Sequence, residues 1–361
     1  MRRGHYVKLR GAVFTAPACS KMGIGQGMLY TARLDRLETF MENSTQLLWR
    51  QQATLAGRRV LVMEANDPAL AELPAEQLYL HADDYTVGAH QWAPLPTLPE
   101  DVDLVILPLP KAAERLELLL RALAGQIEAP MEVWLVGPAK GGIRGGVTRL
   151  SRFADEVALL DSARHCKLYG GQLRPAQPLA LEQVASLTTL DDLQVVSYPG
   201  VFSHGRLDEG SALLLEALAE GLPRGKVLDM GCGGGALSAR LAHSGCQVTA
   251  TDVSATAVAA ATATLERNHL QGKVVGGDLY ESIGARFEAI VTNPPFHDGR
   301  DRTMSITRRL IREAPEHLTD KGTLWMVANR ELPYAQWLDQ AFKHVQVVRE
   351  TNRFRVYRAL R

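Results

Sequence analysis

Residues 227–237 read VLDMGCGGGAL, and they decide the fold. An apolar strand ends with Asp229 and runs into glycines at alternate positions, Gly231, Gly233 and Gly235, before a helix-forming segment begins. Glycine is needed here because only its backbone can turn this sharply and still approach a bound nucleoside closely. The stretch therefore predicts the first strand, turn and helix of a Rossmann-like α/β sheet.

Two further aspartates end later strands of the same predicted sheet. The strand at residues 247–251 ends at Asp252, where a carboxylate can accept hydrogen bonds from both ribose hydroxyls of a nucleoside. Asp278 follows the apolar residues 274–275 at the end of a third strand. A nicotinamide dinucleotide uses a related glycine turn and carboxylate, so these residues alone leave a dehydrogenase open.

The tetrapeptide Asn293-Pro294-Pro295-Phe296 ends another apolar strand, at the edge where open α/β sheets bind their ligands. The side-chain oxygen of Asn293 and the carbonyl of Pro294 can accept both N–H bonds of a planar NH₂ group, and the prolines stiffen the turn. Phe296 either stacks on the base that carries this amine or belongs to the core. Dehydrogenases have no use for this tetrapeptide, so it favours chemistry on an amine.

The glycine spacing resembles motif I of class I methyltransferases. From about Thr45 to Arg361 the chain resembles the two-domain, RsmC-type family of 16S rRNA guanine-N2 methyltransferases. The residues that carry this resemblance are PGVFS at 199–203, NPPFHDG at 293–299 and RFRVYRA at 353–359. The resemblance implies S-adenosylmethionine as the cofactor. It also implies a guanine amine of 16S rRNA, in the small ribosomal subunit, as the substrate.

The resemblance also implies roles for single residues. Those implied to bind the cofactor are Asp229, Gly231, Gly233, Gly235, Asp252, Asp278 (at the adenine amine) and Asn293. Those implied to act on the substrate amine are Asn293, Pro294, Pro295 and Phe296.

Several other functions stay open at this point. Related N-P-P-[FY] enzymes methylate a 23S rRNA guanine, an adenine amine or a protein glutamine amide. A ribosome-assembly factor that binds RNA without catalysis is a further alternative, although the intact Gly231, Gly233, Asp252 and Asn293 oppose it.

The two halves of the chain follow the same plan. Apolar, strand-like runs in the first half are residues 60–63, 104–107 and 133–136, with a helix expected at 112–123. Those in the second half are residues 227–229, 247–251, 289–292 and 324–327, followed by an antiparallel pair at 345–349 and 354–357. Three segments of the first half resemble segments of the second half in the same order: residues 59–63 resemble 226–230, 133–137 resemble 324–328, and 168–169 resemble 356–357. This common order predicts duplication of one α/β fold.

The first copy has lost the residues of a cofactor site. Where the glycine-rich turn belongs, residues 62–67 read VMEAND, and where N-P-P-F belongs, residues 107–110 read LPLP. We therefore expect a degenerate methyltransferase-like domain at 41–178, which supports folding or holds RNA, a linker at 179–196 and a catalytic domain at 197–361. Residues 1–40 are expected to be an extension, either disordered or a misassigned start.

Basic side chains suggest where RNA is held. Lys140, Arg144, Arg149 and Arg152 lie in a basic stretch of the first half, and Arg300 and Arg302 follow the N-P-P-F sequence. These six are candidate phosphate contacts, although an ordinary solvated surface explains them equally well.

Composition narrows the class of protein. The net charge of zero excludes a uniformly basic nucleic-acid binder, so any RNA surface has to be local. The four cysteines have no zinc-site or disulfide-framework spacing, which predicts a cytoplasmic protein without a metal. No apolar run approaches the roughly 18 to 20 residues of a membrane helix, so no membrane partner is expected.

Overall fold

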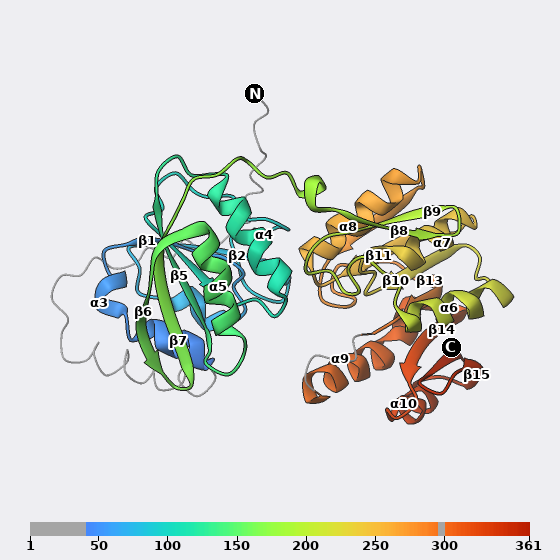
Figure 1. Ribbon diagram of the computed structural model, residues 1–361. Helices are drawn as coiled ribbons and strands as arrows, with labels where there is room; N and C mark the ends of the chain where they lie inside the picture. The colour runs from blue at the N-terminus through green and yellow to red at the C-terminus, as the bar shows by residue number, and fades with distance from the viewer. Residues whose placement is uncertain (1–40, 295–299) are drawn as a thin grey trace. The chain divides into compact units, whose positions relative to one another are not determined.

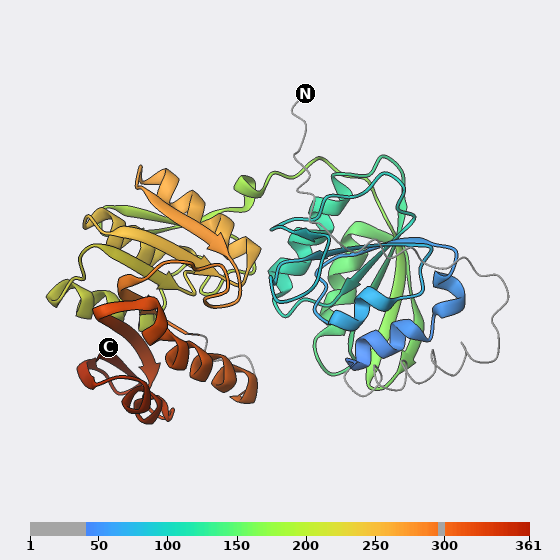
Figure 2. The same cartoon turned by 180° about the vertical axis from the view of Figure 1, so that it is seen from behind.

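The computed structural model describes residues 41–294 and 300–361, without the side chains of residues 300–303. The extension predicted at residues 1–40 lies outside these ranges. Figures 1 and 2 show the described chain from two opposite sides. No helix in the described ranges is long and apolar enough to cross a membrane.

Seven strands form the first sheet, in the order β3-β2-β1-β4-β5-β7-β6. They are β1 (Arg59–Val62), β2 (Gln77–Ala82), β3 (Gln91–Trp92), β4 (Leu104–Pro108), β5 (Met131–Pro138), β6 (Ala154–Ala163) and β7 (Cys166–Leu173). All neighbouring strands from β3 to β5 pair in parallel, and β7 pairs antiparallel with both β5 and β6. β4 is buried along its whole length, which explains its uninterrupted apolar sequence.

Helices cover both faces of this sheet. They are α2 (Asn43–Trp49), α3 (Gln52–Leu55), α4 (Ala113–Ala124) and α5 (Ile143–Phe153). Alternate residues of β1 point to opposite faces, so Val60 packs with Leu47 of α2, whereas Leu61 packs with Leu116 of α4 and Leu150 of α5. The blue helices α2 and α3 stand in front of the sheet in Figure 2. The sheet is thus the middle layer of three.

The second sheet repeats this topology in the order β12-β11-β10-β13-β14-β16-β15. Its strands are β10 (Lys226–Met230), β11 (Gln247–Asp252), β12 (Gly272–Gly276), β13 (Phe287–Thr292), β14 (Leu318–Asn329), β15 (His344–Glu350) and β16 (Phe354–Leu360). Its helices are α6 (Glu209–Glu220), α7 (Ala236–His243), α8 (Ala255–Arg267), α9 (Arg300–Glu313) and α10 (Tyr334–Ala341). Leu228 packs on the face of α9 and α10, and Val227 on the face of α6 and α7.

Strand pairing confirms that the two halves share one fold. Tyr169 on β7 lies opposite Leu135 on β5, and Tyr357 on β16 lies opposite Met326 on β14. These four residues occupy matching positions of the segments that the sequence aligned. Two Rossmann-like domains are therefore present, as expected from the sequence.

The segment predicted as a linker contains more structure than expected. It forms a short 3₁₀ helix, η2 (Leu181–Val184), and a hairpin of β8 (Ser186–Leu190) and β9 (Leu193–Ser197). The hairpin is attached to α8, because the N–H of Val196 donates to Thr264 Oγ1 at 2.8 Å and that of Gln194 donates to Asn268 Oδ1 at 2.9 Å. Part of the predicted linker therefore packs on the second sheet's domain.

Candidate cofactor and active site

The glycine-rich turn connects β10 to α7 with its backbone exposed on one side. Gly231, Gly233 and Gly235 all have positive φ angles, of 74°, 52° and 79°, which favour glycine. A Cβ at Gly231 or Gly233 would meet no atom within 4 Å, whereas a Cβ at Gly235 would lie 2.9 Å from the Cα of Ala261 on α8. The first two glycines therefore border open space, and the third allows two helices to pack closely.

Asp252, at the end of β11, holds this turn in place. Its Oδ2 accepts a hydrogen bond from the N–H of Gly233 at 2.9 Å, and its Oδ1 accepts one from the N–H of Ser254 at the same distance. Burial raises the pKa of the carboxyl, and the backbone donors oppose that rise. Each carboxylate oxygen can accept a further bond, so the ribose role predicted for Asp252 is compatible with its position.

Asp229 is fully buried where β10 meets the turn. Its Oδ2 accepts a hydrogen bond from Ser238 Oγ at 2.5 Å, and its Oδ1 has no partner in the described part of the chain. Burial raises the pKa of Asp229 to about 7, and the nearby negative charge of Asp252 adds to the rise. A carboxylate that is costly to ionise becomes stable beside a bound cation, so the site suits a positively charged ligand.

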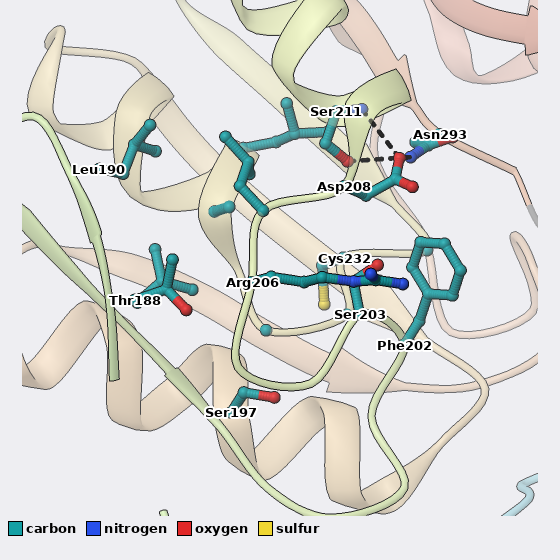
Figure 3. A pocket seen from close by; sticks show the side chains of 17 residues that line it. Thr188, Leu190, Ser197, Phe202, Ser203, Arg206, Asp208, Ser211, Cys232 and Asn293 are labelled. Carbon is teal, nitrogen blue, oxygen red and sulfur yellow. Dashed lines mark hydrogen bonds between the residues drawn. The ribbon is translucent and has the colours of Figure 1, made fainter. Parts of the chain in front are cut away.

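Asn293 lies just beyond β13, with its side-chain amide held in one orientation (Figure 3). Its Nδ2 donates hydrogen bonds to Asp208 Oδ2 at 2.8 Å and to Ser211 Oγ at 2.9 Å. Its Oδ1 is buried without a partner in the described residues. An uncompensated acceptor of this kind is costly unless a ligand donates to it. The arrangement suits a substrate that carries N–H groups.

A pocket joins the turn to Asn293 (Figure 3). Its walls come from the β8–β9 hairpin, the loop before α6, the start of α6, the glycine-rich turn and Asn293. Sequence reasoning singled out PGVFS at 199–203 but gave it no role in the site. Phe202 from that segment lines the pocket with 55% of its surface exposed, and Asp208 lies on the same loop.

The remaining predicted site residues fall in different places. Pro294 is buried directly after Asn293, whereas Pro295 and Phe296 lie outside the described residues. The Asp278 carboxylate is 2.6 Å from Arg309 on α9, a hydrogen-bonded pair that raises the pKa of Arg309. The structure therefore gives Asp278 a protein partner in addition to its predicted adenine contact. Within the described ranges, no group of His, Cys, Asp or Glu is arranged to hold a metal.

The first domain has a different arrangement at the matching position. The strand registers place Ala82 of β2 where the second domain has Asp252, and Val62 of β1 where it has Asp229. The Arg115 guanidinium from α4 lies here instead, 2.8 Å from the Glu64 carboxylate and almost fully buried. An ion pair between the buried Arg115 and the partly buried Glu64 thus lies where the second domain has Asp229 and Asp252.

The predicted RNA-contacting residues of the first half gather on and before α5. Lys140, Arg144 and Arg152 are exposed, and Arg149 is half-buried. Arg300 and Arg302 belong to α9, and their side chains lie outside the part of the chain that the structure describes.

Comparison with known proteins identifies the family. Residues 45–187 match the family Methyltransferase small domain N-terminal, and residues 192–358 match Methyltransferase small domain. A protein of Alcanivorax borkumensis named ribosomal RNA small subunit methyltransferase C is 59% identical over 324 residues, which cover 89% of this chain and 99% of that protein. This chain belongs to the ribosomal RNA small subunit methyltransferase C family. A family member from Pseudomonas entomophila is 38% identical over 89% of this chain and its own whole length.

A solved structure of the family agrees with the fold. The T. thermophilus 16S rRNA N2 G1207 methyltransferase, in complex with AdoMet and guanosine, superposes with a TM-score of 0.76 and 25% identity. The match covers 89% of this chain and 92% of that one. In the present methyltransferase, the open glycine turn and the buried Asp229 beside Asp252 fit the sulfonium and ammonium charges of S-adenosylmethionine. S-adenosylmethionine is its cofactor, as the sequence resemblance implied.

Proposed function

We propose that this enzyme transfers a methyl group from S-adenosylmethionine to the exocyclic N2 amine of guanine 1207 in 16S rRNA of the small ribosomal subunit. The T. thermophilus enzyme is named for methylation of N2 of G1207 in 16S rRNA, and the Alcanivorax borkumensis protein for methylation of small-subunit ribosomal RNA. The observation that carries the proposal for this chain is the fixed amide of Asn293, whose Oδ1 has no hydrogen-bond donor in the described protein.

The residues of the site position the amine rather than activate it chemically. Asn293 Oδ1 and the main-chain carbonyl of Pro294 accept the two N–H bonds of the guanine amine and turn its lone pair toward the methyl donor. Both acceptors also favour the positive charge that develops on the nitrogen. We assign Pro295 to stiffening of this turn and Phe296 to stacking on the base.

The cofactor supplies an electrophilic methyl group on a cationic sulfur. Gly231 and Gly233 leave room for it against the backbone, and Gly235 keeps the following helix close. Asp252 is assigned to the ribose hydroxyls, Asp278 to the adenine amine and Asp229 to the positive charge of the methionine portion. As the new N–C bond forms, the S–C bond breaks and the amine loses one proton to solvent, so no covalent enzyme intermediate is needed.

We assign RNA binding partly to the first domain (41–178), with residues 179–196 leading into the catalytic domain (197–361). Lys140, Arg144, Arg149 and Arg152 are proposed phosphate contacts, and Arg300 and Arg302 are proposed contacts beside the active site. We place the enzyme in the cytoplasm because its proposed substrate is ribosomal RNA. We propose neither a metal cofactor nor a membrane partner.

The substrate assignment is tested with small ribosomal subunits that lack their own methylations. The enzyme is incubated with labelled S-adenosylmethionine and with small subunits, free 16S rRNA or large subunits in parallel, and the RNA is digested to nucleosides. We expect N2-methylguanosine in the small-subunit RNA at the proposed position. Label in 23S rRNA, in N6-methyladenosine or in protein would replace this substrate with another, and no transfer despite cofactor binding would favour an assembly factor.

The phosphate contacts are tested by salt dependence. Exchanging Lys140 and Arg144 for glutamine removes two exposed positive charges, so the slope of log K against log salt for RNA binding should fall by about 1.4 to 1.8. Arg174→Gln is the matched control, because Arg174 is ion-paired with Asp155. An unchanged slope in the double variant would place the RNA on another surface.

A further inference from the structure

Asp208 stands directly before α6, and the residues that the structure describes donate hydrogen bonds to only one of its two carboxylate oxygens. Its Oδ2 accepts hydrogen bonds from the main-chain N–H of Ser211 at 3.0 Å and from Nδ2 of Asn293 at 2.8 Å (Figure 3). Its Oδ1 makes no hydrogen bond or ion pair with the residues that the structure describes. The side chain is half-buried and lines the pocket, so Oδ1 is accessible to a ligand.

The Asp208 carboxylate also decides which way the Asn293 amide is turned. A carboxylate only accepts hydrogen bonds, so the amide nitrogen of Asn293 has to face Asp208 and the amide oxygen has to face away. Ser211 Oγ accepts a second bond from the same nitrogen at 2.9 Å. Asn293 Oδ1 and Asp208 Oδ1, two acceptor atoms without donors in the described part of the chain, therefore lie on side chains that are hydrogen-bonded to each other.

Two neighbouring acceptors match one edge of guanine in particular. The Watson–Crick edge of guanine presents two adjacent donors, the N1–H and the N2 amine. Adenine has an acceptor at N1, which a carboxylate would repel, and 2-aminopurine combines the guanine 2-amine with the same N1 acceptor. An acceptor beside the amine site therefore separates guanine from both of these bases.

We propose that Asp208 selects guanine: its Oδ1 accepts the N1–H of the target base while its Oδ2 fixes the amide of Asn293 for the N2 amine. This inference rests on the proposed function and extends it with a residue that determines base specificity. The other ligand group with the right charge is the ammonium of the cofactor's methionine portion. The proposed function assigns Asp229 to that ammonium, so we assign the oxygen of Asp208 that the described residues leave free, in the lining of the pocket, to the base.

The test exchanges Asp208 for asparagine. The new side-chain oxygen can still accept from Ser211 N–H and Asn293 Nδ2, so the amide of Asn293 stays fixed. The new NH₂ group then replaces the free acceptor with a donor, which opposes guanine N1–H and suits the N1 acceptor of 2-aminopurine. Asp320→Asn is the matched control, because Asp320 is almost fully exposed and distant in sequence from the pocket.

Dissociation constants are measured for guanosine and 2-aminopurine riboside on the full-length enzyme with S-adenosylhomocysteine bound. We expect wild type and Asp320→Asn to prefer guanosine by about tenfold or more, and Asp208→Asn to lose or reverse that preference with S-adenosylmethionine affinity unchanged within about twofold. An unchanged preference in Asp208→Asn overturns the proposal. A loss of cofactor affinity with the preference kept also overturns it and assigns Asp208 to the ammonium.

Two further measurements keep the test independent of how the variant folds. Wild-type enzyme should bind 1-methylguanosine about tenfold or more weakly than guanosine, because the methyl group replaces the N1 hydrogen; equal binding overturns the proposal. Methyl transfer by wild type to small subunits is recorded in parallel. If wild type forms no N2-methylguanosine, the proposed function is wrong. If wild type transfers the methyl group but binds guanosine and 1-methylguanosine equally well, only the role of Asp208 is wrong.

Discussion

Replacing Asp229 with asparagine should stabilise the cofactor-free enzyme, and the gain should grow with pH. Asp229 is fully buried, with one oxygen bonded to Ser238 and the other without a partner in the described protein. Burial raises its pKa from an ordinary value of 3.8 to about 7. The folded protein therefore holds this proton more tightly than the unfolded chain does, so folding stability falls as pH rises from about 4 to about 7.

The size of the effect follows from the two pKa values. One unit of pKa corresponds to about 1.4 kcal/mol, so the raised pKa of the buried carboxyl lowers the free energy of unfolding by about 4 kcal/mol at pH 8 and by about 2 kcal/mol at pH 5. The amide that replaces the carboxyl cannot ionise, and its own packing cost does not depend on pH. The difference in stability between variant and wild type should therefore increase by about 2 to 3 kcal/mol across this range.

Urea unfolding of both proteins without cofactor, at constant ionic strength from pH 5 to pH 8, measures this difference. Titrating groups that do not interact with Asp229, such as the buried His81, contribute equally to both proteins and cancel. Calorimetry should show that Asp229→Asn binds S-adenosylmethionine more weakly, because the variant lacks the counter-charge that we assign to the ammonium. A stability difference that stays constant with pH would refute the raised pKa and the reasoning built on it.

Three further outcomes are expected. Gly235→Ala should lose about 1 to 3 kcal/mol of stability, measured by urea unfolding, because the added methyl would lie 2.9 Å from the Cα of Ala261 at a positive φ; a neutral effect would contradict the close packing. Asp252→Ala should weaken S-adenosylmethionine binding by at least about tenfold in calorimetry, since it removes the proposed ribose acceptor and the bond to the glycine turn; unchanged affinity would place the ribose elsewhere. Arg115→Ala should destabilise the first domain by about 3 to 5 kcal/mol, because it leaves the Glu64 carboxylate unpaired; thermal melting checks this, and an unchanged midpoint would show that the pair is not needed.

Local sequence patterns predicted the glycine-rich turn and the strand ends well. Gly231, Gly233 and Gly235 all adopt backbone angles that favour glycine, which is a property of those residues and can be inferred without a structure. Asp252 and Asn293 end or directly follow parallel strands, so the topology of the sheet brings them to one edge. The six-residue run at 62–67 likewise indicated correctly that the first domain lacks the glycine turn.

Local sequence patterns could not predict contacts between segments that are distant in the sequence. Asp208 and Asn293 are 85 residues apart, and nothing in either local sequence shows that they hydrogen-bond. The β8–β9 hairpin was read as a linker because its strands are only five residues long and lie in a polar stretch. β6 was missed because it is an edge strand whose Leu159 and Leu160 are both exposed, so it lacks the alternation of a half-buried strand.

The central claim is that the second domain methylates a guanine amine held by Asn293. The most direct measurement is single-turnover methyl transfer to unmethylated small subunits by wild type and Asn293→Ala, with S-adenosylmethionine affinity measured on the same preparations. We expect N2-methylguanosine from wild type and a rate lower by about a hundredfold or more in the variant, a much larger loss than any loss of cofactor affinity. Equal rates would contradict the claim, because the amine would then be positioned by other residues.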